Sequence, residues 1–127
     1  MKLTIEQALQ QGVAAHKEGK LQDAERLYQA ILRSQPEHPD ANHNLGVLAV
    51  SLNQAELSLP LFEKALKANS KIEQFWLSYI DALIKAKRFY SAKETLKQGR
   101  KLGLIVSEVD ALEAHLIPTT QVNAGKL

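Results

Sequence analysis

The side chains that could do chemistry begin with four histidines, which are His16, His38, His43 and His115. Two histidines on one helix can hold a metal when they stand four residues apart, and no pair here has that spacing. The chain has no cysteine, which excludes thiolate metal sites and disulfides. The acidic residues form no obvious catalytic pair, and the six glycines are scattered rather than gathered in a phosphate-binding loop. We therefore expect no catalytic centre, no cofactor and no metal ion.

Basic side chains are concentrated between residues 85 and 101, where seven of the 16 lysines and arginines lie. Four of them follow the spacing i, i+4, i+7, i+8 of one helix side, and these are Lys93, Lys97, Arg100 and Lys101. This basic stripe could bind an acidic partner or a nucleic-acid backbone, but a solvated outer face is the simpler interpretation. The formal net charge of +2 does not by itself imply a nucleic-acid partner, and we expect none.

Length and composition favour a single soluble domain. A chain of 127 residues with 45% hydrophobic residues is long enough to bury a core. The opening MKLTIEQALQQ is interrupted by Glu6 and several glutamines, so it is not a secretory signal, and no apolar run approaches the length of a membrane span. Together with the absence of cysteine, these features predict a cytoplasmic protein with no membrane partner.

The helices that would position these residues follow a pattern that the chain states three times, with a period of 34 residues. Positions 8, 20 and 24 of the pattern are Gly12, Ala24 and Tyr28, then Gly46, Ser58 and Phe62, then Ile80, Ala92 and Leu96. This period, with small residues at 8 and 20 and a large one at 24, is the signature of the tetratricopeptide repeat. From about residue 5 to residue 104 the chain resembles that family, with the strings GKLQDAERLYQAILRSQP, NHNLGVLA and RFYSAKETL. The third copy departs from the pattern at Ile80, where Gly or Ala is expected, and at Lys87, which replaces the turn Gly.

The resemblance implies an all-α fold. It would be an α-α superhelix, or solenoid, of three helix-turn-helix repeats at residues 5–38, 39–72 and 73–106. A seventh, capping helix at about 107–116 would cover the apolar face of the last repeat, and residues 117–127 are expected to form a flexible tail or linker. The domain would then span residues 1–116.

Apolar periodicity and turn residues set the bounds of each expected helix. The six are residues 4–17, 21–33, 40–51, 55–68, 72–86 and 90–101. A Ser or Thr followed three residues later by Glu or Gln is a capping box, and Thr4 with Gln7 and Ser70 with Glu73 fit that motif. Pro60 falls in the second turn of the fourth helix, where it deletes a backbone donor, so we expect it to kink or fray the start of that helix.

The resemblance also implies a concave surface, because in this family the first helix of each repeat lines a groove. An extended peptide or a partner helix suits such a surface, since it mixes apolar contacts with hydrogen-bonding groups. The residues that we expect to contact this partner are Val13, His16, His43, Asn44, Val47, Gln74, Leu77, Ser78 and Asp81.

Asn44 bears on what the groove could hold. Family members that bind the acidic C-termini of chaperones use a clamp of Lys, Arg and Asn for two carboxylates. Only Asn44 matches that clamp, because Leu9, Val13, Gln74 and Ser78 occupy its other four places, so the required charge is absent. Asn44 also resembles the asparagine with which repeats of the O-linked N-acetylglucosamine transferase type hold a peptide backbone. A hydrogen bond between helices is the structural alternative for this side chain.

These features favour a protein-interaction scaffold without catalysis. A second hypothesis comes from similar bacterial repeats that precede a glycosyltransferase, sulfotransferase or methyltransferase domain, in which case the chain would be the substrate-presenting arm of an enzyme. Whether the natural reading frame continues past Leu127 discriminates between these two hypotheses. A third hypothesis is self-association through an uncovered end or the groove, and sedimentation would test whether the chain is a monomer or a weak homo-oligomer.

Overall fold

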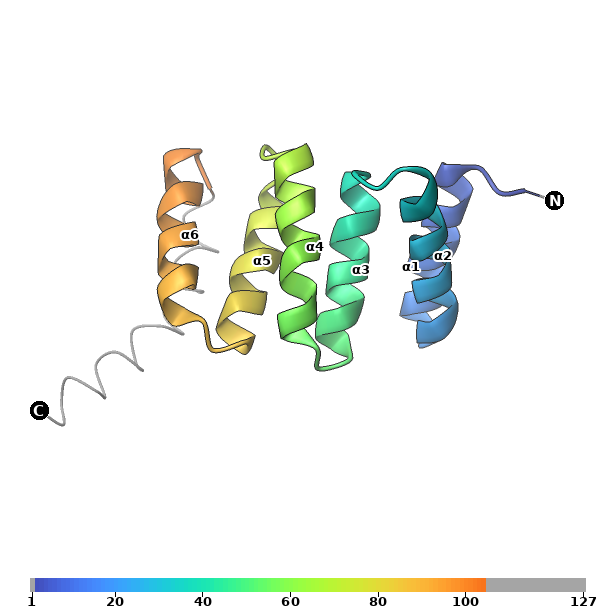
Figure 1. Ribbon diagram of the computed structural model, residues 1–127, viewed down its shortest axis with the longest axis horizontal. Helices are drawn as coiled ribbons and strands as arrows, with labels where there is room; N and C mark the ends of the chain where they lie inside the picture. The colour runs from blue at the N-terminus through green and yellow to red at the C-terminus, as the bar shows by residue number, and fades with distance from the viewer. Residues whose placement is uncertain (1, 105–127) are drawn as a thin grey trace, which may run out of the picture.

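The computed structural model describes residues 2–104, which form six helices and no strand. These helices are α1 (Ile5–Lys17), α2 (Leu21–Ser34), α3 (Pro39–Ser51), α4 (Ala55–Ala68), α5 (Glu73–Lys85) and α6 (Phe89–Lys101). Each helix packs against its neighbours in the chain, and they stand roughly side by side from α1 to α6 (Figure 1). The all-α repeat fold is confirmed, with every expected bound met within one residue. The expected capping helix at 107–116 and the tail at 117–127 lie outside the described residues.

In each of the first two repeats, the two helices of the pair meet where an aromatic ring lies on a glycine. A Cβ atom added at Gly12 would lie 2.5 Å from Cε1 of Tyr28, and one added at Gly46 would lie 2.7 Å from Cε1 of Phe62. Both rings are almost completely buried, at 1% exposure each. The absence of a side chain at position 8 therefore lets the paired helices approach until the ring of position 24 fills the space between them.

In the third repeat the helix pair packs at the same two positions, but the larger side chain now lies on the first helix and a smaller one on the second. Ile80 stands in place of the glycine and is fully buried, while Leu96 stands in place of the ring and is 3% exposed. The larger side chain on α5 is thus offset by a smaller one on α6, and Ala92 between them has no exposed surface. The departure from the repeat pattern at Ile80 keeps the core filled.

Helix ends follow the local sequence signals at most positions. The Gln7 N–H donates to Thr4 Oγ1 and the Thr4 N–H donates to Gln7 Oε1, each over 3.0 Å, which confirms the first capping box. Gly19, Asn53 and Lys87 occupy the turn inside the three pairs, one period apart, and their φ angles are 79°, 62° and 63°. The turn demands the left-handed conformation in every copy, even where the residue is a lysine.

The second capping box, expected from Ser70 and Glu73, is wrong. The N-cap of α5 is Ile72, and no side chain caps this helix. The Ser70 carbonyl instead accepts a hydrogen bond of 2.8 Å from the Trp76 indole N–H. Asn69 turns the chain at this point, because its Oδ1 accepts from the Lys71 N–H at 3.1 Å.

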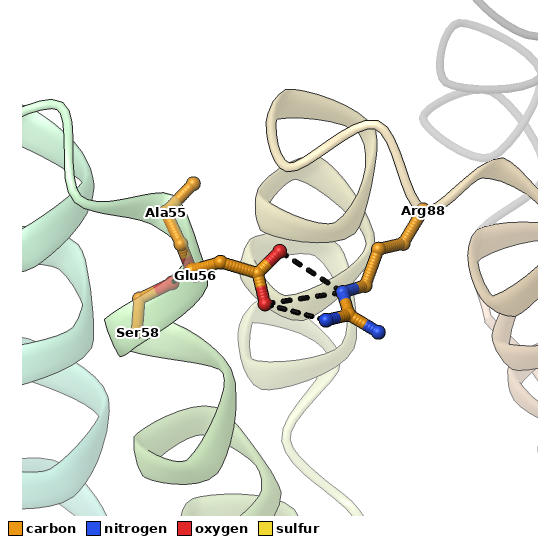
Figure 2. A network of polar contacts seen from close by, with 4 residues as sticks. All are labelled: Ala55, Glu56, Ser58 and Arg88. Carbon is orange, nitrogen blue, oxygen red and sulfur yellow. Dashed lines mark hydrogen bonds and ion pairs between the residues drawn. The ribbon is translucent and has the colours of Figure 1, made fainter.

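Pro60 does not interrupt α4, so the expected fraying is also wrong. The missing N–H leaves only the Glu56 carbonyl without its helical partner. The first turn is held in other ways, because the Ser58 hydroxyl donates to the Ala55 carbonyl over 2.6 Å. In addition, the Arg88 guanidinium grips both carboxylate oxygens of Glu56, with Nη2 2.7 Å from Oε1 and Nε 2.9 Å from Oε2 (Figure 2). This bidentate ion pair connects the start of α4 to the turn before α6.

We expect Gly46→Ala to destabilise the protein although alanine is the better helix former. The gain in helix propensity is about 1 kcal/mol, whereas forcing a methyl group against the buried Phe62 ring costs about 1–3 kcal/mol. Urea unfolding followed by circular dichroism measures the difference. Phe62→Leu made in the Gly46→Ala background should recover part of the loss, because the smaller side chain frees space. A Gly46→Ala variant more stable than the parent would contradict the ring-on-glycine packing.

Candidate functional site

We refer to the face formed by α1, α3 and α5 as the concave surface, after the groove that the resemblance implies. These three helices are the first members of their pairs, and α3 contacts both α1 and α5 directly. All nine residues expected to bind a partner lie on these helices. The structure brings seven of them together in two groups, one between α1 and α3 and the other between α3 and α5, whereas Leu77 and Asp81 belong to neither group.

The first group lines a hollow of about 370 Å³ between α1 and α3. Its lining residues are Val13, His16, Lys17, Tyr28, Asn44 and Val47. Two valines make its walls apolar, Lys17 supplies a cation, and Asn44 supplies a side-chain amide. Tyr28 was not expected here, because its place in the repeat pattern marks it as core, and no sequence signal shows that part of it borders the hollow. The arrangement can hold a small group that carries a hydrogen-bond acceptor beside an apolar one.

The second group is a chain of four polar side chains that joins α3 to α5. Gln74 Nε2 donates to Ser78 Oγ over 3.1 Å. Ser78 Oγ lies 2.8 Å from His43 Nε2, and His43 Nδ1 lies 3.1 Å from Asn44 Oδ1. Asn44 belongs to both groups, so the polar chain ends in the hollow.

We expected His43 to face a partner in the groove, but its side chain is enclosed. The residue is 9% exposed, and its ring stacks on Phe75 with centroids 4.8 Å apart and planes at 27°. A second ring, that of Phe62, lies at 5.5 Å and 53°. Burial lowers the pKa of His43, and the hydrogen bond to Asn44 and the charge of Asp40 oppose that shift. Burial therefore favours the uncharged imidazole.

The other expected groove residues differ in how available their side chains are to contact a partner. Leu77 is half-buried and packs against the core of the last two repeats. Asp81 is engaged in an ion pair, with its Oδ2 2.9 Å from Lys85 Nζ. His16 approaches Ser51 only weakly, at 3.5 Å, which leaves it available to the hollow. The open part of the surface is thus centred on the space between α1 and α3.

Asn42 is a structural residue that the sequence did not reveal. It is 1% exposed, and its Nδ2 donates to the carbonyls of Pro36 and His38, each over 3.0 Å. One period later the indole N–H of Trp76 donates to the carbonyl of Ser70. In both copies the side chain at position 4 therefore holds the loop before its own helix. The sequence signal that could have revealed this role is that both residues at position 4 carry a side-chain N–H donor.

The described part of the chain offers little else that could do chemistry. Within residues 2–104, no three His, Asp or Glu side chains are grouped so that they could hold a metal ion. Among the same residues, no helix is long and apolar enough to cross a membrane. The basic stripe lies exposed on α6, with Lys97 Nζ 3.8 Å from Glu94 Oε1, and Lys93 and Arg100 also interact with neighbours. These contacts favour a solvated outer face.

Larger hollows lie outside the concave surface. One of about 620 Å³ lies along α1 and α2, and one of about 810 Å³ is lined by α4, α5 and α6. Charges of both signs line each of them, and some are already paired, as Arg26 is with Asp23 at 3.7 Å. Neither adjoins the chain of polar side chains, so the hollow between α1 and α3 remains the better candidate for recognition.

Comparison with known proteins agrees with the repeat pattern. A family model described as tetratricopeptide repeat matches residues 9–71. A comparison with curated proteins finds no match.

Solved structures resemble the chain over most of its length. The TPR domain of Sgt2 from Aspergillus fumigatus is 21% identical with a TM-score of 0.83, and the match covers 97% of this chain and 83% of that one. The TPR2B domain of yeast Sti1, in a complex with pHsp70, is 20% identical with a TM-score of 0.82, covering 91% and 97%. The Yersinia enterocolitica chaperone SycD, with a peptide of the translocator YopD, is 16% identical with a TM-score of 0.80, covering 97% of each chain. Likeness at these identities shows a shared fold.

The lowered pKa of His43 predicts acid destabilisation. The unfolded chain takes up a proton near the ordinary histidine pKa of about 6.5, which the folded chain resists, so stability is full above that pH and falls below it. Urea unfolding at pH values from about 7.5 to 5.5 should show this fall. His43→Gln cannot titrate and should flatten the profile. A variant profile as steep as that of the parent would show that His43 is not the group responsible.

Proposed function

Because the chain belongs to the tetratricopeptide repeat family, we propose that it is a non-catalytic scaffold whose concave surface binds a peptide or partner helix. The observation that carries this proposal is the hollow between α1 and α3, where apolar walls and convergent polar groups meet on the concave surface. A site of this composition gains affinity from burying apolar surface and gains orientation from its polar groups.

The apolar part of the surface extends beyond the hollow. The side chains of Val13, Val47, Val50, Leu77 and Ile84 are half-buried on α1, α3 and α5. Each leaves apolar surface in contact with water that a partner could cover, at about 25 cal/mol per Å² removed. A row of such side chains over three helices suits an extended segment or one face of an amphipathic helix.

Two similar structures support a peptide or protein partner. The Sti1 domain was solved in a complex with pHsp70 and SycD with a peptide of YopD. The present chain differs from a carboxylate clamp in its charges, because Leu9 and Val13 take the places of Lys and Asn on α1. We therefore propose a partner recognised through apolar contact and single hydrogen bonds.

The test replaces two side chains of the hollow at once. Asn44→Ala removes a hydrogen-bonding group and Val47→Glu places a charge on the apolar wall, so the double variant should lose binding while keeping its helicity. The probe is a random dodecapeptide library selected on the parent protein, with each selected peptide measured by calorimetry. The matched control combines Gln54→Ala, at the N-cap of α4, with Leu57→Glu on α4. Leu57 is 64% exposed, and both residues lie outside the hollow. Selected peptides that bind the Asn44 and Val47 variant with unaltered affinity would exclude the concave surface as the site.

A further inference from the structure

With the Asn44 and Gln74 amides oriented as they are in the structure, the four polar side chains between α5 and the hollow form one consistent series of donors and acceptors. Gln74 Nε2 is a donor, so Ser78 Oγ accepts from it and has its own hydrogen left to donate. Its partner at 2.8 Å is His43 Nε2, which can accept that hydrogen. This direction requires an unprotonated Nε2, and a neutral imidazole then carries its hydrogen on Nδ1.

The hydrogen on Nδ1 determines how Asn44 is turned. His43 Nδ1 donates to Asn44 Oδ1 over 3.1 Å, so the carbonyl end of this amide faces the histidine. What remains is the Nδ2 group with two N–H donors. The effects of Asn44 on its neighbours agree, since its hydrogen bond raises the pKa of His43, as an acceptor does, and lowers that of Tyr28, as a donor does.

We propose that His43 is a positioning residue for the groove: it holds the Asn44 carbonyl through Nδ1–H, so that Asn44 presents only N–H donors to the hollow between α1 and α3. Ser78 and Gln74 fix the tautomer on which this depends. The specificity of the hollow is therefore set from the next repeat, through a side chain that does not line it.

The hydrogen-bond donors around the hollow determine which chemical groups it can select. Asn44, Lys17 and Tyr28 all line it, and each side chain carries an N–H or O–H group that can donate a hydrogen bond. A carbonyl or carboxylate oxygen fits this set, whereas a cation meets the charge of Lys17 and finds no amide oxygen. This selectivity rests on the proposed function, but the orientation of Asn44 does not and can be measured without any ligand.

The first measurement is the tautomer of His43, read from the ¹⁵N shifts of its two ring nitrogens at pH 7.5. We expect the Nδ1–H form, together with NOEs from the Asn44 Nδ2 hydrogens to the methyl groups of Val13 and Val47. Ser78→Ala removes the donor to Nε2 and should increase the share of the Nε2–H form. A parent protein with mainly the Nε2–H tautomer would overturn the proposal, and so would an unchanged tautomer in Ser78→Ala.

Two substitutions of His43 then separate its two nitrogens. His43→Asn places an amide nitrogen where Nδ1 was and can still donate to Asn44, whereas His43→Gln places its amide where Nε2 was and keeps only the contact with Ser78. Both variants lose the ring contacts with Phe62 and Phe75, so a merely structural role predicts equal effects. We expect the NOEs from Asn44 to Val13 and Val47 to survive in His43→Asn and to disappear in His43→Gln. Equal spectra for the two variants would refute the positioning role.

The last arm uses three small probes on the parent protein: acetate for a carboxylate, N-methylacetamide for a peptide carbonyl, and methylammonium for a cation. The NMR shift of the Asn44 side-chain amide should change on addition of acetate, N-methylacetamide or both, and should not change with methylammonium. Whichever of the two oxygen probes binds more tightly shows whether the hollow prefers a carboxylate or a peptide carbonyl. His43→Gln should bind that probe about two- to tenfold more weakly, as expected for one lost hydrogen bond. Equal response to methylammonium would overturn the selectivity. Failure of library peptides to bind, with the tautomer and NOEs as expected, would instead count against the proposed function.

Discussion

The contact between an aromatic ring and a glycine sets the spacing of the paired helices. In the first repeat the ring of Tyr28 occupies the space that a side chain at Gly12 would need, and Phe62 does the same over Gly46. Neither ring has room to move aside, because both are almost fully buried. The helix pairs are therefore held at one distance, and the following helix packs on a surface of fixed shape.

The groove follows from that spacing. Once each pair is fixed, repeating it places α1, α3 and α5 on the same side, and side chains one period apart come to lie in comparable positions. The link from His43 to Ser78, which are 35 residues apart, shows how one repeat reaches the next across the concave surface. Buried groups of this kind are tolerated only when they are hydrogen-bonded. All buried side-chain polar atoms among residues 2–104 have a partner.

Sequence reasoning predicted local features better than contacts between repeats. Helix bounds agree within one residue, because periodicity, caps and turn residues act over a few positions. The capping role of Ser70 was wrong because α5 begins at Glu73 with Ile72 as its N-cap, two residues later than the motif requires. The Ser70 carbonyl accepts instead from Trp76, a contact that no capping motif encodes. His43 was placed correctly on the concave helix, but its burial depends on Phe75, which the next repeat supplies. Tyr28 fills position 24 of the repeat pattern, and that it also borders the hollow depends on how α1, α2 and α3 meet.

A map of where a bound peptide touches the protein tests most directly whether the face formed by α1, α3 and α5 is the binding surface. Backbone amide shifts of the ¹⁵N-labelled chain would be followed as a library-selected peptide is added. A concave binding surface predicts that the largest changes fall on α1 and α3 around Val13, Asn44 and Val47, and extend to α5 at Leu77. Changes confined to the outer helices α2, α4 and α6 would contradict it.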